Sequence, residues 1–252
     1  MVDIHRVSDK AALTEQAALD FIDLVAACQA PGGGRHGDGV ARVVLTGGSA
    51  GIGMLEQLRR FAAAAQAQGE DFPALQVDWS RVHVFFGDER NVAVDDPESN
   101  EGQARAALLD HVDIPDSHIH GYGLGEADLE QAAADYAAVL NEYAPRGFDL
   151  HLLGMGGEGH INSLFPHTPA VREQESLVVA VTDSPKPPAE RASLTLPAIR
   201  RAEQVWLLVS GQEKAEAAQH VIDRADALDW PAAGAQGERA TRLYLADDAA
   251  AQ

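Results

Sequence analysis

The chain has 252 residues, of which 46% are hydrophobic, and a formal net charge of −20. This length fits one large α/β domain or two small ones, and the composition is ordinary for a globular protein. An acidic surface repels the phosphates of nucleic acids and anionic lipids, so we expect neither nucleic acid nor membrane as a partner. A phosphate site would need local cations and backbone donors.

The first thirty residues carry charged side chains throughout, so the sequence predicts no signal peptide and favours a cytoplasmic protein. Apolar residues at helical spacing predict an amphipathic helix over 10–29. The glycine-rich segment 31–39 then predicts a flexible loop rather than a domain linker. The single cysteine, Cys28, can form neither an internal disulfide nor a cysteine-based metal cluster.

Strands and helices alternate along the rest of the chain, and no repeat or change of composition marks a second domain. We therefore expect a single domain over 1–252 with a mostly parallel sheet and helices on both faces. The predicted strands are 41–46, 82–86, 148–153, 177–182 and 204–210, with 242–245 as a last edge strand. The predicted helices follow the turn at 47–51 and cover 99–111, 128–143 and 213–225, and the tail at about 247–252 is expected to fray.

Three predicted strands end in unusual sequences, and ligands of parallel sheets bind at the carboxyl ends of the strands. These ends are Thr46-Gly-Gly-Ser49, Gly87-Asp-Glu-Arg90 and Gly154-Met-Gly-Gly-Glu-Gly-His160. We expect them to meet at one edge of the sheet and to form the site.

Two of these ends resemble dinucleotide-binding turns, because 46–53 fits TGxxxGxG and 154–159 fits GxGxxG. The acidic residue that would bind a ribose is missing, since Glu70 and Asp71 have no strand before them. No tyrosine has lysine four positions later, and Pro166 leaves little room for a long helix after 154–159. The sequence therefore disfavours an NAD(P) oxidoreductase.

The same glycines suit a single phosphate better. Gly47, Gly48 and Ser49 would place backbone N–H groups at a helix N-terminus, which is an anion nest, although a plain strand-to-helix turn would have the same sequence. Four glycines within 154–159 would let a substrate approach His160 closely. Histidine is suited to general-base catalysis because its pKa lies near neutrality. The histidines have no metal-site spacing with a carboxylate, so we predict no metal.

Two further segments concentrate charge. Asp88, Glu89 and Arg90 bring two carboxylates and a guanidinium to a strand end, as a site or as a surface ion-pair cluster. The proline-stiffened loop 184–191 carries Lys186 and Arg191, which could face an anion at low entropic cost or be an ordinary solvated charge run.

These segments together resemble the 6-phosphogluconolactonase family. The resemblance rests on 148–166, on Phe85-Phe-Gly-Asp-Glu-Arg90 with Asp96-Pro-Glu-Ser-Asn100, on Ser184-Pro-Lys186 with 191–197, and on Thr46-Gly-Gly-Ser49. The segments follow the family order and span about 41–215. The chain departs from many relatives at Ala50-Gly51, at Glu158 where aspartate is common, and at Ile161-Asn162.

The resemblance implies a Rossmann-like α/β fold and the hydrolysis of 6-phospho-D-glucono-1,5-lactone to 6-phosphogluconate without a cofactor. It implies His160 as general base and Arg90, Lys186 and Arg191 as contacts to the anionic substrate. Arg90 is also a catalytic candidate, as a donor to the oxyanion, together with Asp88 and Glu158. The other candidates for substrate or phosphate binding are Gly47, Gly48, Ser49 and Asn100.

Two other functions stay open beside this one. An amino-sugar-phosphate isomerase or deaminase of the same superfamily would have tyrosine at Arg90 and a glutamate within 163–166, and the chain has neither. A sugar-phosphate-binding protein without activity is disfavoured by the intact His160. We expect a phosphorylated sugar lactone as the ligand and a monomer or weak dimer in solution.

Overall fold

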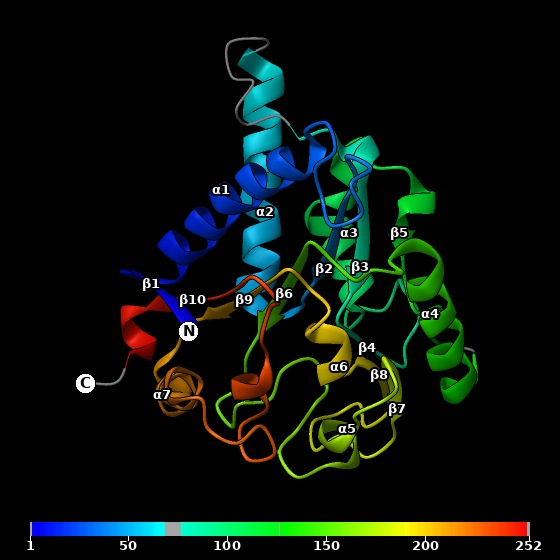
Figure 1. The fold of residues 1–252 in the computed structure, drawn as a ribbon, viewed down its shortest axis with the longest axis vertical. Helices are drawn as coiled ribbons and strands as arrows, with labels where there is room; N and C mark the ends of the chain where they lie inside the picture. The colour runs from blue at the N-terminus through cyan, green and yellow to red at the C-terminus, as the bar shows by residue number, and fades with distance from the viewer. Residues whose placement is uncertain (1, 69–76, 126, 251–252) are drawn as a thin grey trace.

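A seven-stranded parallel sheet runs through the centre of the computed structural model, which describes residues 2–68, 77–125 and 127–250 (Figure 1). The strand order is β1-β10-β9-β6-β2-β3-β5, and every neighbouring pair is parallel. The strands are β1 (Val2–Val7), β2 (Ala41–Leu45), β3 (Val82–Phe86), β5 (Ile119–His120), β6 (Leu150–Gly154), β9 (Gln204–Val209) and β10 (Ala240–Ala246). A small antiparallel sheet has the order β4 (Asp88–Arg90), β8 (Arg191–Leu194) and β7 (Val178–Val181).

Helices surround the large sheet. They are α1 (Lys10–Gln29), α2 (Gly48–Gln68), α3 (Asn100–Ala107), α4 (Leu129–Tyr143), α5 (Pro169–Arg172), α6 (Leu196–Ile199) and α7 (Ala215–Asp223). Helices α1 and α2 pack against each other, α1 over β2, β9 and β10 and α2 over β6 and β9, while α4 packs on β7 and β8. Short 3-10 turns join them: η3 (Trp79–Arg81), η4 (Leu109–His111), η5 (Asp116–His118), η6 (Gln212–Lys214), η7 (Pro231–Gly234) and η8 (Asp247–Ala249).

The central strands are buried along most of their length, because helices and loops cover both faces of the sheet. Every residue of β2 is buried, and so are the last five of β9. Continuous apolar runs of this kind are typical of parallel strands. Removing a leucine or valine side chain from water stabilises the fold by about 1.5–3 kcal/mol, which makes these strands the rigid support for the loops at their ends.

The strand order reverses between β2 and β6. From β2 the chain proceeds outward through β3 and β5, and from β6 it proceeds in the other direction through β9 and β10. Loops leave such a point in opposite directions and open a crevice at the carboxyl ends of the two strands. The loops that follow β2 and β6 are the two glycine-rich turns, so the fold places them side by side at the crevice.

The predicted alternation of strands and helices is confirmed, although β1 and β5 were not predicted and several other elements differ from the prediction. Residues 240–246 form an inner strand rather than an edge strand, because β1 pairs with β10 on its outer side. Strand 177–182 belongs to the small antiparallel sheet, together with β4 and β8, which the sequence analysis did not identify. The tail expected to fray instead forms η8, in which Ala249 is buried and Asp248 accepts a hydrogen bond from the Gly211 amide, while 251–252 lie outside the described residues.

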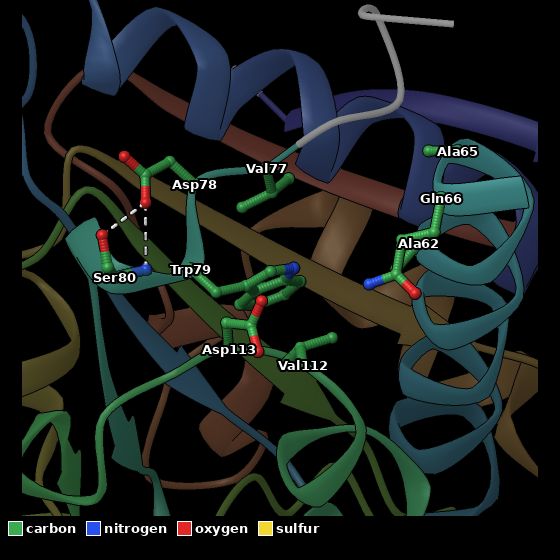
Figure 2. Close-up of a pocket in the computed structure, with 9 residues that line it drawn as sticks. All are labelled: Ala62, Ala65, Gln66, Val77, Asp78, Trp79, Ser80, Val112 and Asp113. Atoms are coloured by element: carbon green, nitrogen blue, oxygen red, sulfur yellow. Dashed lines mark hydrogen bonds between the residues drawn. The ribbon is translucent and has the colours of Figure 1, made fainter. Parts of the chain in front are cut away.

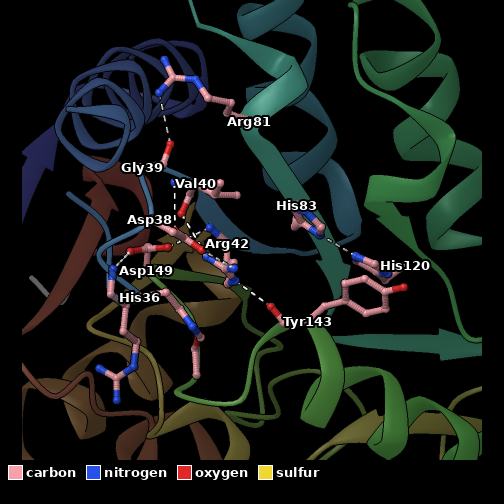
Figure 3. Close-up of polar contacts among 12 residues, drawn as sticks. His36, Asp38, Gly39, Val40, Arg42, Arg81, His83, His120, Tyr143 and Asp149 are labelled. Atoms are coloured by element: carbon pink, nitrogen blue, oxygen red, sulfur yellow. Dashed lines mark hydrogen bonds and ion pairs between the residues drawn. The ribbon is translucent and has the colours of Figure 1, made fainter. Parts of the chain in front are cut away.

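The loop at 31–39, expected to be flexible, is held by a polar network (Figure 3). The Asp149 carboxylate accepts hydrogen bonds from the amides of Arg35 and Arg42, at 2.6 and 2.7 Å. The Arg42 guanidinium pairs with Asp38 at 2.8 Å and donates to the carbonyl of Tyr143 at the end of α4. These bonds fix the loop against the amino ends of the strands.

A pocket of about 400 Å³ lies beside η3, at the amino end of β3 (Figure 2). One of its polar side chains, Asp78, is engaged within the protein, because the carboxylate accepts hydrogen bonds from Ser80 and pairs with Arg81. Because η3 precedes β3, the pocket lies at the amino ends of the strands, at the end of the sheet opposite the crevice. Among the described residues, no helix is both long and apolar enough to cross a membrane.

Candidate active site

The crevice holds a polar pocket of about 170 Å³ whose walls come from the ends of four strands. The turn after β2 supplies residues 46–51, β6 and its loop supply Gly154, Met155, His160 and Asn162, and the small sheet supplies Asp88, Arg90 and Arg191. Asn100 at the start of α3, Leu208 and Lys214 complete the wall. Eight of the ten candidate residues predicted from the sequence line this pocket, and Glu158 and Lys186 lie next to it on His160.

The loop after β6 presents His160 by a tight turn. The Gly156 amide donates to the His160 carbonyl and the Gly159 amide donates to the Gly156 carbonyl, both at 3.0 Å. A side chain at position 156 would clash, since a Cβ there would lie 2.0 Å from the His160 Nδ1. The imidazole stacks on Phe165 with ring centroids 4.5 Å apart. These contacts fix the ring plane, which explains why the loop needs its glycines.

Glu158 and Lys186 meet at the Nδ1 side of the His160 ring. The Glu158 Oε1 lies 3.1 Å from Nδ1 and 3.0 Å from the Lys186 Nζ, and the Nζ lies 3.4 Å from Nδ1. Among the described residues no hydrogen bond occupies Nε2. The arrangement therefore favours the tautomer in which Nδ1–H donates to Glu158 and Nε2 carries the lone pair.

The His160 imidazole is held neutral by its surroundings. Burial of the ring lowers its pKa, and the Lys186 charge lowers it further, whereas Glu158 and Asp88 act in the opposite direction. A neutral imidazole near pH 7 is the form that can accept a proton.

Arg90 and Asn100 form another part of the pocket wall. The Arg90 Nη1 donates to the Glu98 carbonyl at 2.6 Å and to the Asn100 Oδ1 at 3.1 Å, while its Nε is buried without a partner among the described residues. A buried guanidinium N–H without an acceptor is costly in the free protein. Arg90 can therefore offer a charged donor to an anion or oxyanion in the pocket.

Asp88 fixes its neighbours rather than facing the pocket freely. Its Oδ1 accepts from the Asn100 Nδ2 at 3.2 Å and its Oδ2 accepts from the Ser163 hydroxyl at 2.7 Å. Glu89, the next residue, is buried and accepts hydrogen bonds from the amides of Asn100 and Glu101, at 2.8 and 2.9 Å. Burial raises the pKa of Glu89, and those amide donors oppose the rise. The two carboxylates anchor the start of α3 to β4.

Arg191 lines the pocket from β8, but part of its guanidinium is already engaged. Its Nη2 donates to the carbonyls of Lys186 and Pro187 at 3.0 and 3.1 Å, and its Nε donates to the Pro188 carbonyl at 3.0 Å. The side chain is buried. Arg191 therefore ties the loop 184–190 to the wall of the pocket.

The turn after β2 begins helix α2 at Gly48, so the first amides of the helix open into the pocket. Lys214, at the end of η6, lies in the same pocket and forms no ion pair with any described residue. Burial lowers the pKa of Lys214. The sequence analysis missed this lysine, although its position five residues after β9, behind Gly211, fits the rule that sites collect at strand ends.

Comparison with known proteins identifies the family of the chain. The family model described as "Glucosamine-6-phosphate isomerases/6-phosphogluconolactonase" matches residues 8–244. The chain belongs to this family. A 6-phosphogluconolactonase of Mycobacterium leprae is 52% identical over 221 residues, which cover 84% of this chain and 85% of that protein.

Solved structures of the glucosamine-6-phosphate isomerase/6-phosphogluconolactonase family share the fold. A 6-phosphogluconolactonase from Thermotoga maritima superposes with a TM-score of 0.78 at 23% identity, covering 98% of this chain and 100% of that one. A monomeric glucosamine-6-phosphate deaminase gives the same TM-score at 21% identity and covers 98% of each chain. The Rossmann-like α/β fold is thus confirmed, and within this family the choice of reaction must come from the residues of the site.

Proposed function

We propose that the chain hydrolyses 6-phospho-D-glucono-1,5-lactone to 6-phosphogluconate, with His160 as general base. The observation that carries the proposal is a neutral, half-buried imidazole whose Nδ1 is engaged by Glu158 and whose Nε2 is left for a water molecule. The 52% identity to a 6-phosphogluconolactonase supports the same reaction. Residues 163–166 are Ser-Leu-Phe-Pro and contain no carboxylate, which argues against the deaminase alternative.

The reaction needs one base and no covalent intermediate. The His160 Nε2 takes a proton as the water oxygen attacks the lactone carbonyl carbon, and the carbonyl oxygen becomes an oxyanion. The bond from the carbonyl carbon to the ring oxygen then breaks, and Nε2 returns the proton to that oxygen. The new carboxylic acid releases its own proton to solvent. Glu158 stabilises the transient imidazolium through Nδ1–H, as the acidic member of a triad does.

Arg90 is our candidate for stabilising the oxyanion. Its buried Nε has no acceptor among the described residues, so a developing negative charge would gain a charge-assisted hydrogen bond. Such preorganised donors typically contribute ~3–4 kcal/mol to the transition state. Asp88 and Asn100 act as positioning residues, because both hold the wall that carries Arg90.

We assign the phosphate to the nest at Gly47, Gly48 and Ser49 together with Lys214. The first amides of α2 supply neutral donors, and Lys214 supplies the cation that a dianion needs in a chain of net charge −20. The lowered pKa of Lys214 would rise toward its ordinary value when a phosphate arrives, which favours binding. Arg191 contributes through the loop that it holds.

The test is a coupled assay in which glucose-6-phosphate dehydrogenase generates the lactone in situ and the release of 6-phosphogluconate is followed. We expect hydrolysis of the lactone far above the spontaneous rate, and no loss of this hydrolysis when a chelator removes metal ions. Hydrolysis at the spontaneous rate, with turnover of glucosamine 6-phosphate instead, would overturn the proposal. We also propose that the protein is cytoplasmic and that it is a monomer or weak dimer. Sedimentation across a hundredfold range of concentration tests the oligomeric state.

A further inference from the structure

Lys186 is assigned to the substrate phosphate by the sequence resemblance, but its ammonium lies with the general base. The Nζ is 3.0 Å from the Glu158 Oε1 and 3.4 Å from the His160 Nδ1. It also lies 5.8 Å from the centre of the Phe165 ring on which His160 stacks. Lys186 is not among the residues that line the pocket. Its charge therefore acts on the side of the imidazole that faces away from the substrate.

The backbone at Lys186 is held in place by the loop that carries it. The Lys186 carbonyl accepts from the buried Arg191 Nη2 and from the Ser184 hydroxyl, both at 3.0 Å, and its amide donates to the same hydroxyl at 3.2 Å. Arg191 lies on β8, in register with Arg90 on β4. The loop is thus fixed to the small antiparallel sheet that also carries Arg90. This places the Lys186 side chain beside Glu158.

Three charged groups act on the His160 ring, and each comes from a different element. Glu158 belongs to the loop after β6, Lys186 to the loop before β8, and Asp88 to β4. Phe165 covers one face of the ring without a charge. Lys186 is the cation in this set. Without it, burial alone would oppose the two carboxylates, and the balance would move toward the protonated ring, which cannot accept a proton from water.

We propose that Lys186 is a positioning residue for His160: it shares the Glu158 carboxylate with the Nδ1–H of the imidazole and keeps the ring neutral, with Nε2 toward the pocket. This rests on the proposed function in that His160 is taken as the base. Arg191 acts one step further back, since it holds the loop from which Lys186 extends.

The decisive variant is Lys186→Met, which keeps the length of the side chain and removes the charge. The lysine side chain is 47% exposed, so the fold should be retained. We expect the acid limb of the kcat/KM profile to move to higher pH, with kcat/KM reduced about three- to tenfold at pH 6 and approaching the wild-type value at pH 8.5, after subtraction of spontaneous hydrolysis. Lys186→Arg keeps the cation and should restore the wild-type profile.

Two matched variants sharpen the result. Glu158→Gln removes the opposing charge and should move the acid limb to lower pH, while Arg60→Met removes a positive charge from an exposed position on α2 and should leave the profile unchanged. The shift for Lys186→Met should be the same with unphosphorylated gluconolactone as the substrate. A loss confined to the phosphorylated lactone and equal at every pH would overturn the proposal and return Lys186 to the phosphate.

A readout without turnover keeps this proposal separate from the proposed function. The NMR titration of the His160 ring protons, assigned with His160→Asn, should show a higher midpoint in Lys186→Met than in the unmodified chain. An unchanged midpoint would overturn the role of Lys186 whatever the enzyme does. If the unmodified chain lacks lactonase activity but the midpoint still moves, the proposed function fails while the inferred coupling stands.

Discussion

His160 and a cluster of three other histidines differ in the groups that surround them. His160 lies at the carboxyl end of β6 with a carboxylate and an ammonium at one ring nitrogen. The histidine cluster formed by His83, His118 and His120 lies at the outer edge of the sheet, on β3, η5 and β5, and the His83 ring stacks on the other two. Figure 3 shows His83 beside His120. Burial lowers the pKa in both groups, for His83 and His120 to about 4. A lowered pKa therefore does not distinguish His160 from the cluster; its place in an open pocket and its charged partners do.

The strongest way to test this contrast is His160→Ala. We expect kcat to fall by ~10²–10⁴ with the fold intact, because the base is removed while the pocket remains. The matched control is His83→Phe, which keeps an aromatic ring in the cluster and should leave kcat within about twofold. Retention of more than half of the wild-type kcat in His160→Ala would contradict the assignment.

The cluster should instead govern stability in acid. The His83 Nδ1 and the His120 Nε2 lie 2.8 Å apart, so one donates to the lone pair of the other and the two rings cannot both be protonated. Burial also lowers the pKa of His151 in β6, to about 3. In the unfolded chain these residues bind protons near pH 6.5, so the stability they confer is present above 6.5 and is lost as the pH falls toward 4.

Between pH 7 and pH 5 we expect the free energy of unfolding in urea to fall by roughly 3 kcal/mol because of His83, His120 and His151. The contributions of His83 and His120 are discounted in this figure for their partial exposure. His83→Phe should make this decrease shallower. A free energy of unfolding that is constant from pH 7 to 5 would contradict the neutral cluster.

Trp230 packs against the loop that carries His160. Gly159 has φ +78°, a Cβ there would lie 2.8 Å from the indole, and the Gly159 carbonyl accepts from the Ala232 amide at 2.9 Å. The His220 ring stacks on the indole of Trp230, with the ring centroids 4.0 Å apart. Trp230→Ala should free the loop and lower kcat about tenfold with KM little changed, whereas Trp230→Phe should recover most of the loss. An equal loss in both variants would exclude a packing role for the ring.

The smallest effect is expected at His151, which is fully buried with both ring nitrogens unpartnered among the described residues. His151→Leu has a similar volume and removes two unsatisfied polar atoms. We expect it to raise the free energy of unfolding at pH 7 by about 1 kcal/mol without changing kcat. A destabilised variant would mean that the imidazole makes a polar contact, for instance with a buried water.

The sequence was sufficient for the elements whose pattern is local. The runs at 41–46 and 82–86 are rich in β-branched and aromatic residues and could be predicted as strands, and glycines after 46 and 154 indicated the candidate site. Strands β4 and β8 could not be predicted, because three and four residues acquire strand structure only by pairing across a separation of about a hundred residues.

The directions of side chains were also outside the reach of the sequence. Lys186 and Arg191 carry the charges that a phosphate attracts, and nothing local indicates that the arginine donates to the loop carbonyls and the lysine to Glu158. Lys214 was overlooked because it stands in no glycine-rich motif, yet η6 brings it to the pocket. Proximity across loops is set by the packed sheet and not by the spacing of residues.

The pairing of β1 with β10 has a consequence for how the chain is made. The first strand aligns over all six of its residues with 241–246, more than two hundred positions later. Synthesis proceeds from the N-terminus, so β1 has no partner until nearly the whole chain has left the ribosome. The strand must wait as an unpaired segment while β2, β3 and β6 can already assemble. Completion of the sheet at this edge is therefore a late event of folding, and a stalled nascent chain would display β1 as a free edge to chaperones.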